Sequence, residues 1–88
     1  MKDLEGQREK IDLIDDKIIR LIVERMKIIG KISKIKEHSK LEIRDIKREN
    51  QIKRKWIKRA KAKGANEKLS LKVISLLLEE SIAKQKKQ

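Results

Sequence analysis

An apolar row along the first part of the chain predicts one long helix. Alternate steps of four and three residues from Leu4 select ten positions, of which six are Leu or Ile. Such spacing places side chains on one face of an α-helix. We expect this helix to run from about Leu4 to Glu37 and to be about 50 Å long. The ten positions, called the seam below, are Leu4, Arg8, Ile11, Asp15, Ile18, Ile22, Arg25, Ile29, Ile32 and Lys36.

Two shorter helices are predicted after the long one. Residues 38–44 break the periodicity, and Asp45 is a suitable N-cap for a second helix that reaches about Lys63. Gly64 can end that helix in a left-handed conformation, and Asn66 can cap a third helix. The chain has no Pro, Phe or Tyr and no alternating strand pattern, so we expect an all-α fold. The apolar face of the third helix is Leu71, Ile74, Leu78, Ser81 and Gln85.

Charged residues interrupt the seam where a purely structural helix would carry aliphatic side chains. These residues are Arg8, Asp15, Arg25 and Lys36. A buried charge costs several kcal/mol unless it is paired or meets a ligand. Three cations and one acid therefore predict a site that receives a negatively charged group. The polar interruptions of the other two helix faces are Glu49, Ser81 and Gln85.

The composition predicts a single small domain over residues 1–88. In a chain of 88 residues, 45% are charged and 1% are aromatic. A lone domain of this size buries only about 60% of its unfolded surface, so we expect oligomerisation. With no cysteine and one histidine, the chain offers neither a disulfide framework nor a Cys/His metal site.

The net charge of +12 suits an anionic partner but does not choose between nucleic acid and a small molecule. The apolar runs, such as residues 74–78, are too short to cross a bilayer. No charged segment followed by an apolar one begins at Met1. We therefore expect a cytoplasmic protein.

The distances between seam residues along the helix bear on the quaternary structure. Arg8 and Arg25 lie 17 residues apart, which is about 25 Å along one helix. That separation is too long for both side chains to hold one small molecule. If the site uses both, Arg8 must come from an antiparallel second chain. Arg25 and Lys36 are about 16 Å apart and can converge on one ligand because both side chains are long.

Five segments carry a family resemblance. They are residues 8–12 (REKID), 24–25 (ER), 35–36 (IK), 45–49 (DIKRE) and 81–85 (SIAKQ). With these segments in order, the chain resembles the all-helical class of chorismate mutase over essentially its whole length. The resemblance implies an intertwined helical-bundle homodimer that rearranges chorismate to prephenate, on the way to Phe and Tyr, without a cofactor. Because no dehydratase, dehydrogenase or synthase domain follows the third helix, we expect a monofunctional enzyme.

The resemblance also implies residue roles. Arg8 from the partner chain and Arg25 would bind the two carboxylates of chorismate, with Ser81 assisting. Lys36 and Gln85 would donate to the ether oxygen of the breaking bond. Glu49 would bind the ring hydroxyl, helped by the backbone at Asp45, and Arg48 would add positive charge around the site. No metal is expected.

Two other functions fit parts of the sequence. An isochorismate-pyruvate lyase on the same fold would use a similar frame of arginines and lysine, although Glu49 favours the mutase. A basic nucleic-acid-binding protein fits the charge and Trp56, which could stack on bases, but nucleic acid is the disfavoured partner. Asp15 is better explained by a structural ion pair or solvent exposure, His38 by a surface position, and Trp56 by packing.

Overall fold

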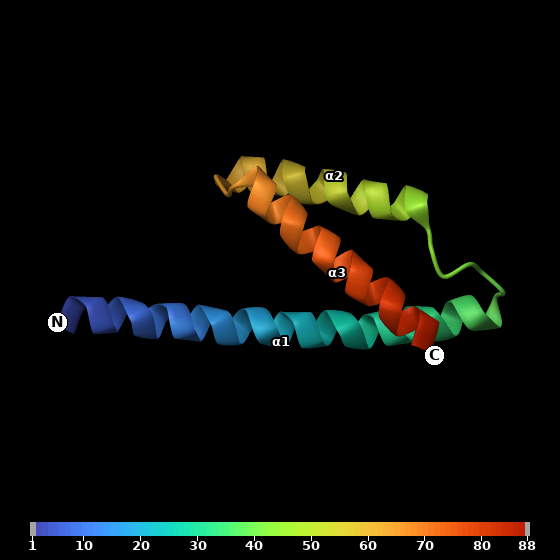
Figure 1. Cartoon of the computed structure of the whole chain (residues 1–88), viewed down its shortest axis with the longest axis horizontal. Helices are drawn as coiled ribbons and strands as arrows, with labels where there is room; N and C mark the ends of the chain where they lie inside the picture. Colours follow the sequence, from blue (N-terminus) through green and yellow to red (C-terminus); the bar gives the residue numbers. More distant parts are fainter. Residues whose placement is uncertain (1, 88) are drawn as a thin grey trace.

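The computed structural model describes residues 2–87 and contains three helices joined by short segments (Figure 1). The helices are α1 (Lys2–His38), α2 (Ile46–Lys63) and α3 (Glu67–Lys87). The predicted all-α class, with one long and two shorter helices, is confirmed. No described helix is both long and apolar enough to cross a membrane.

The helix ends lie where the capping residues predicted them. The Asp45 carboxylate accepts a 3.0 Å hydrogen bond from the Arg48 backbone N–H, and the Asn66 side chain accepts one of 2.8 Å from Leu69 N–H. Gly64 ends α2 with φ at 74°, and Ala65 N–H then donates to Ala60 C=O at 2.8 Å. These bonds satisfy backbone groups that a helix terminus leaves unpaired.

The end of α1 uses a residue that the sequence did not mark. Lys40 has φ at 53°, the left-handed region that glycine normally occupies. Leu41 N–H donates to Lys36 C=O at 2.8 Å, which closes the turn. A lysine there costs about 1 kcal/mol more than a glycine would. The turn sends the chain back toward α2 just beyond Lys36.

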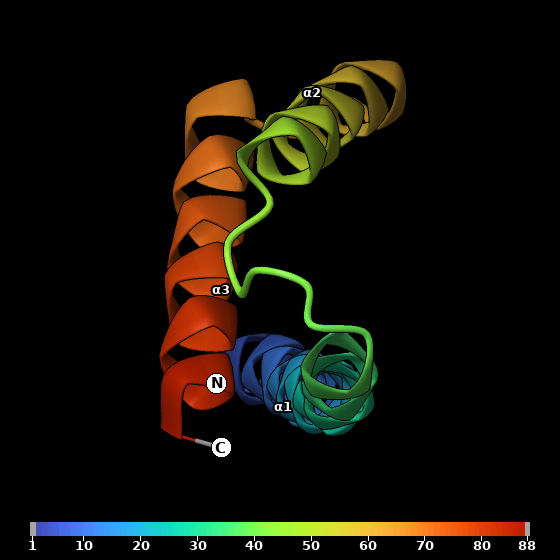
Figure 2. The same ribbon diagram turned by 90° about the vertical axis from the view of Figure 1, so that its right-hand side faces the viewer.

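Helix α3 holds the molecule together. It packs against both α2 and α1, whereas no Cα atoms of α1 and α2 lie within 8 Å of each other. The end-on view shows α2 and α1 on separate levels, bridged by α3 (Figure 2). Ile74 is fully buried on α3, and Leu78 and Ala60 are nearly so. The core of one chain is therefore small and is centred on α3.

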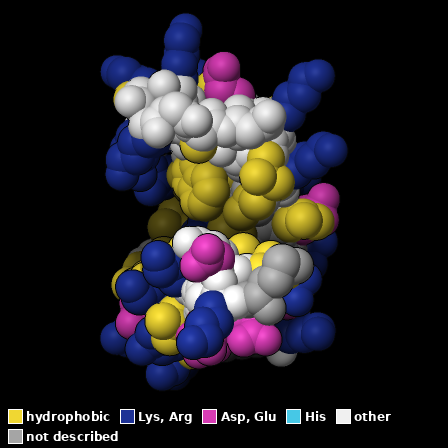
Figure 3. Space-filling view, turned by 90° about the vertical axis from the view of Figure 1, so that its left-hand side faces the viewer, with side chains coloured by type: hydrophobic (Ala, Val, Ile, Leu, Met, Phe, Trp, Pro, Cys, Tyr) yellow, Lys and Arg dark blue, Asp and Glu magenta, His cyan; other side chains and the backbone are white. Residues whose placement is uncertain are grey.

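Much of α1 is left uncovered. The Cα radius of gyration is 16.4 Å and the molecule extends over 57 × 25 × 15 Å, whereas a compact domain of this length would have a radius of gyration of about 12 Å. Apolar side chains gather between α1 and the α2–α3 hairpin (Figure 3). The exposed large apolar residues of α1 are Leu4, Ile11, Leu13, Ile14, Ile18, Ile19, Leu21, Ile22, Val23, Ile28, Ile32 and Ile35.

Candidate active site

A cavity of about 430 Å³ lies where the second half of α1, the start of α2 and the end of α3 approach one another. This volume is within the usual range for small-molecule sites. Its apolar walls are Ile28, Ile29, Ile32, Ile43, Ile52, Leu78 and Ile82. Its polar lining is Arg25, Lys36, Asp45, Arg48, Glu49, Ser81 and Gln85. All seven of these polar residues are among the predicted site residues, and together they span all three helices.

Arg25 is placed on the cavity wall by Ser81 of α3. The guanidinium donates a 2.8 Å hydrogen bond to the Ser81 hydroxyl, which in turn donates to Leu77 C=O at 2.7 Å. Burial lowers the pKa of Arg25, because desolvation disfavours the charged form. Among residues 2–87, no carboxylate forms an ion pair with Arg25. An uncompensated, partly desolvated arginine is suited to bind a carboxylate from a ligand.

Lys36 and Gln85 form a pair of donors at the other end of the cavity. The Lys36 ammonium donates to the Gln85 side-chain oxygen at 3.0 Å and to Ile43 C=O at 2.6 Å. The Gln85 amide nitrogen donates to Ser81 C=O at 3.2 Å. An ammonium has three donors and an amide nitrogen has two. Each group therefore retains one N–H that a single ligand oxygen between them could accept.

Glu49 is held by an arginine that the sequence analysis missed. Arg44 contacts both carboxylate oxygens of Glu49, at 2.8 Å and 3.2 Å. The Glu49 side chain is only 14% exposed, and its hydrogen bond and charge raise the pKa of Arg44. Arg44 lies just before the α2 N-cap, so its spacing of five residues to Glu49 crosses a helix boundary. Helical periodicity could not reveal this pair.

One chain brings some of the remaining predicted residues to the cavity but leaves others away from it. Asp45 uses its side chain to cap α2, and Arg48 donates to Gln51 at 2.9 Å on the exposed rim. Arg8 and Asp15 are exposed on the first half of α1 and do not line the cavity. One chain thus brings together every predicted site residue except Arg8.

Comparison with known proteins decides the family. Residues 7–86 match the family described as Chorismate mutase type II. The chain belongs to this family. The match covers all three helices and every segment on which the resemblance rested, and it confirms the predicted family.

Individual relatives agree with the family assignment. The chain is 35% identical over 79 residues to a chorismate mutase of Methanocaldococcus jannaschii, covering 90% of this chain and 80% of that protein. It is 36% identical over 80 residues to a bifunctional chorismate mutase/prephenate dehydratase of Buchnera aphidicola subsp. Acyrthosiphon pisum, covering 91% of this chain. A protein of the same name from Buchnera aphidicola subsp. Schizaphis graminum is 33% identical over 85 residues. The chain spans about a fifth of the length of the two bifunctional relatives.

Proposed function

We propose that the chain is a homodimeric chorismate mutase that rearranges chorismate to prephenate at the cavity between its three helices. The observation that carries the proposal is the convergence of Arg25, Lys36 and Gln85 on one cavity, with donors that no carboxylate of the described chain satisfies. The product would serve the synthesis of Phe and Tyr. Monofunctionality and a single domain over residues 1–88 remain predictions.

The groups that line this cavity are those that the rearrangement requires. In the rearrangement, the ether C–O bond breaks while a C–C bond forms, and no proton is transferred. No nucleophile, base or cofactor is therefore needed. What lowers the barrier is a substrate held in its reactive chair and fixed donors aimed at the oxygen that gains charge.

Arg25 and Ser81 are proposed to hold one carboxylate of the substrate. Because Ser81 fixes the guanidinium at 2.8 Å, little side-chain freedom is lost when the substrate binds. The fork of an arginine binds a carboxylate through two parallel hydrogen bonds, which sets the orientation as well as the position. Arg48 on the cavity rim adds positive charge, and the backbone at Asp45 is proposed to meet the ring hydroxyl.

Lys36 and Gln85 are proposed to meet the ether oxygen. Negative charge on that oxygen is greater in the transition state than in bound chorismate. Donors already held by Ile43 C=O and Ser81 C=O need no reorganisation when the charge develops. Their interaction therefore favours the transition state over the substrate, which raises kcat.

Glu49 is proposed to accept the hydrogen bond of the ring hydroxyl, with Arg44 as its support. A carboxylate has about four lone-pair sites, so Arg44 can occupy two of them and leave others for the substrate. An acceptor at this place favours chorismate over isochorismate, whose hydroxyl is attached to a different ring carbon. This preference separates the mutase from an isochorismate-pyruvate lyase.

The second carboxylate is proposed to bind Arg8 of the partner subunit. Arg8 lies about 25 Å from Arg25 along α1, so one chain cannot bring both to one ligand. The exposed apolar row on the first half of α1 supports an antiparallel dimer, since monomers seldom expose so long an apolar surface. A partner helix in the space between α1 and α2 would cover this row and complete both sites.

The test is an assay of the purified chain with chorismate and, separately, with isochorismate. We expect chorismate absorbance to decay with formation of prephenate, and no release of pyruvate from isochorismate. Lys36→Ala, purified in the same way, controls for a contaminating enzyme. Loss of chorismate at equal rates in both samples, or pyruvate release as the main reaction, would contradict the proposal.

A further inference from the structure

The positive charge of the chain is concentrated on one helix. Helix α2 carries nine Lys and Arg and one acid, Glu49, within 18 residues. Helix α1 is nearly balanced, with ten basic and eight acidic residues, and α3 has five basic and three acidic residues. A general enrichment in lysine would have charged all three helices alike. Two thirds of the net charge of +12 therefore belongs to α2.

These cations lie on the outside of the molecule. All of the α2 cations except Lys53 are exposed, while the opposite face of α2, with Ile52 and Ala60, packs inward. Cations surround the upper part of the space-filling view, which α2 and α3 form (Figure 3). Steps of four and three along the outer face of α2 select Lys47, Gln51, Arg54, Lys58 and Lys61, a row about 21 Å long.

Nothing in the described chain neutralises this row. The ion pair found among residues 2–87 joins Arg44 to Glu49, and the latter faces the cavity. Like charges three and four residues apart, as in Arg54, Lys58 and Lys61, destabilise a helix by a few tenths of a kcal/mol per pair. The row thus weakens the helix that carries it, and a polyanion would reverse that effect.

The residue types on the outer face of α2 indicate which kind of anion it can bind. A helix that lies on a membrane presents large apolar side chains beside its cations. Among the described residues of α2, Ile46 in the first turn is the exposed large apolar side chain, and the outer row has none. Chorismate is also a poor match, because Arg54, Lys58 and Lys61 do not line the cavity and the row is longer than a small dianion. Regularly spaced phosphates fit a row of this length.

We propose that the outer face of α2 binds the phosphate backbone of nucleic acid, independently of the chorismate site. Contacts to phosphates alone give affinity without base recognition, and they fall steeply with salt. This conclusion departs from the expectation in the sequence analysis, where total charge did not choose between anionic partners and nucleic acid was the disfavoured one. The difference is that α2 carries nine of the cations and that the fold leaves eight of them exposed, with no ion pair among residues 2–87.

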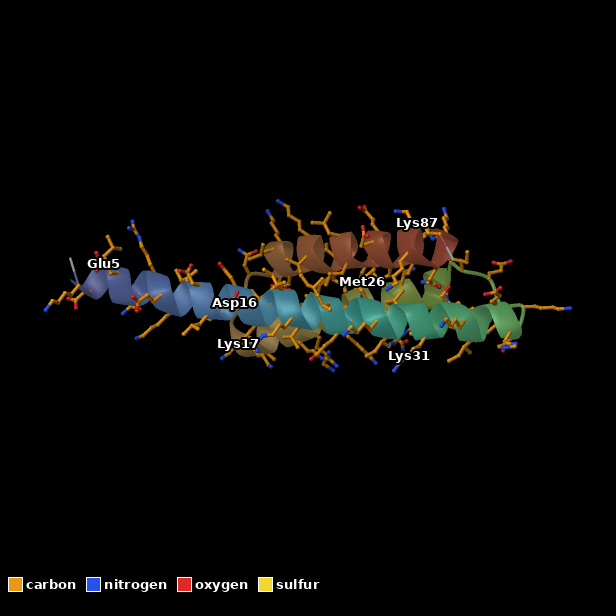
Figure 4. The ribbon with its side chains drawn as sticks, turned by 90° about the horizontal axis from the view of Figure 1, so that it is seen from below. Glu5, Asp16, Lys17, Met26, Lys31 and Lys87 are labelled. Atoms are coloured by element: carbon orange, nitrogen blue, oxygen red, sulfur yellow. The ribbon has the colours of Figure 1, made fainter. Side chains whose placement is uncertain are left out.

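Two triple variants test the proposal. The first is Arg54→Gln, Lys58→Gln and Lys61→Gln on α2. The matched control is Lys27→Gln, Lys31→Gln and Lys34→Gln on α1, which removes the same charge at the same spacing from exposed positions. Lys31 lies along the edge of α1 opposite α3 (Figure 4). Glutamine keeps helix propensity close to that of lysine, and circular dichroism would verify folding of both variants.

The measurement is fluorescence anisotropy of a 20-base-pair DNA duplex between 50 and 200 mM salt. With about four phosphates neutralised, wild-type affinity should fall by about 150-fold over this range. The α2 variant should lose at least 10-fold of the affinity at 50 mM and show a shallower salt slope, by about three. The α1 control should stay within 3-fold of wild type, and both variants should retain wild-type kcat/KM with chorismate.

Several results would overturn the proposal. No duplex binding at 50 mM salt, or equal losses in the two variants, would mean that the face has no special role. Binding to vesicles with 30% phosphatidylserine but not to the duplex would assign the face to membranes. A fall in kcat/KM confined to the α2 variant, with duplex affinity unchanged, would assign it to attracting the substrate. Because activity and duplex binding are measured separately, failure of the mutase assignment would leave this test intact.

Discussion

The two halves of α1 carry the same seam but have different surroundings. In the second half, Arg25 and Lys36 bond to α3 and line a cavity, and Ser33 is buried. Met26 C=O also accepts a 2.9 Å hydrogen bond from Lys84 of α3, and the labelled Met26 lies on the α3 side of α1 (Figure 4). In the first half, Ile11 and Ile18 are at least half exposed and Arg8 forms no ion pair within the described residues.

This difference shows that a helix face predicts burial but not the element that buries it. In the second half of α1, α3 of the same chain covers part of the helix: Ser33 is buried, whereas Ile28 and Ile35 stay exposed. The first half has the same periodicity and no cover within residues 2–87, so the proposed dimer supplies it. Substitutions in each half can show whether both halves belong to one shared site.

The largest effects should come from substituting one arginine in each half of α1 and then mixing the two variant chains. Arg8→Ala and Arg25→Ala homodimers should each lose nearly all activity, because both sites then lack one carboxylate clamp. When the two variants are unfolded together and refolded, half of the dimers are mixed. Each mixed dimer has one intact site, so about a quarter of wild-type activity should return. Refolding each variant alone is the control, and mass spectrometry should confirm mixed dimers; their presence without activity would place each site within one chain.

A substitution of Lys36 tests the second half of α1, which contacts α3 of the same chain. Lys36→Ala should lower kcat by at least ~100-fold, because its ammonium meets charge that develops in the transition state. Lys34→Ala, an exposed lysine on the same helix, is the matched control and should be close to wild type. A change in KM alone would show that Lys36 only binds substrate.

Replacing Gln85 by glutamate should make the reaction depend on pH. Burial lowers the pKa of Arg25, but an arginine still remains charged near neutrality. Wild-type kcat should therefore be nearly flat from about pH 6 to 8. In Gln85→Glu, only the protonated acid can donate to the ether oxygen, so kcat should be at least ~10-fold higher at pH 4.5 than at pH 8. Equal activity at both pH values would remove Gln85 from this role.

Arg44 should have the smallest effect, because it acts through Glu49. Arg44→Gln should lower kcat/KM by about 10-fold, since Glu49 would lose two charge-assisted hydrogen bonds. Adding Glu49→Gln to this variant should cost less than Glu49→Gln costs in wild type, because the two residues act as a unit. Arg54→Gln removes the same charge elsewhere on the chain and should leave kcat/KM unchanged. Fully additive losses would show that Arg44 does not position Glu49.

The sequence alone determined the three helices, their caps at Asp45, Gly64 and Asn66, and the polar side chains that line the cavity. These features depend on local periodicity and on short-range backbone hydrogen bonds, which can be read along the chain. The family resemblance added roles for these side chains, which stay predictions, and the match over residues 7–86 confirms the family.

Only the tertiary structure decided which groups pair inside the cavity and which charged residues stay exposed without an ion pair. The Arg44–Glu49 contact crosses a helix boundary, the Lys36 contact to Ile43 C=O depends on the turn at Lys40, and neither follows a helical period. The uncovered half of α1 and the isolated cationic face of α2 arise for the same physical reason. Burial and charge compensation depend on contacts between distant segments, and a one-dimensional pattern records only which side chains share a face.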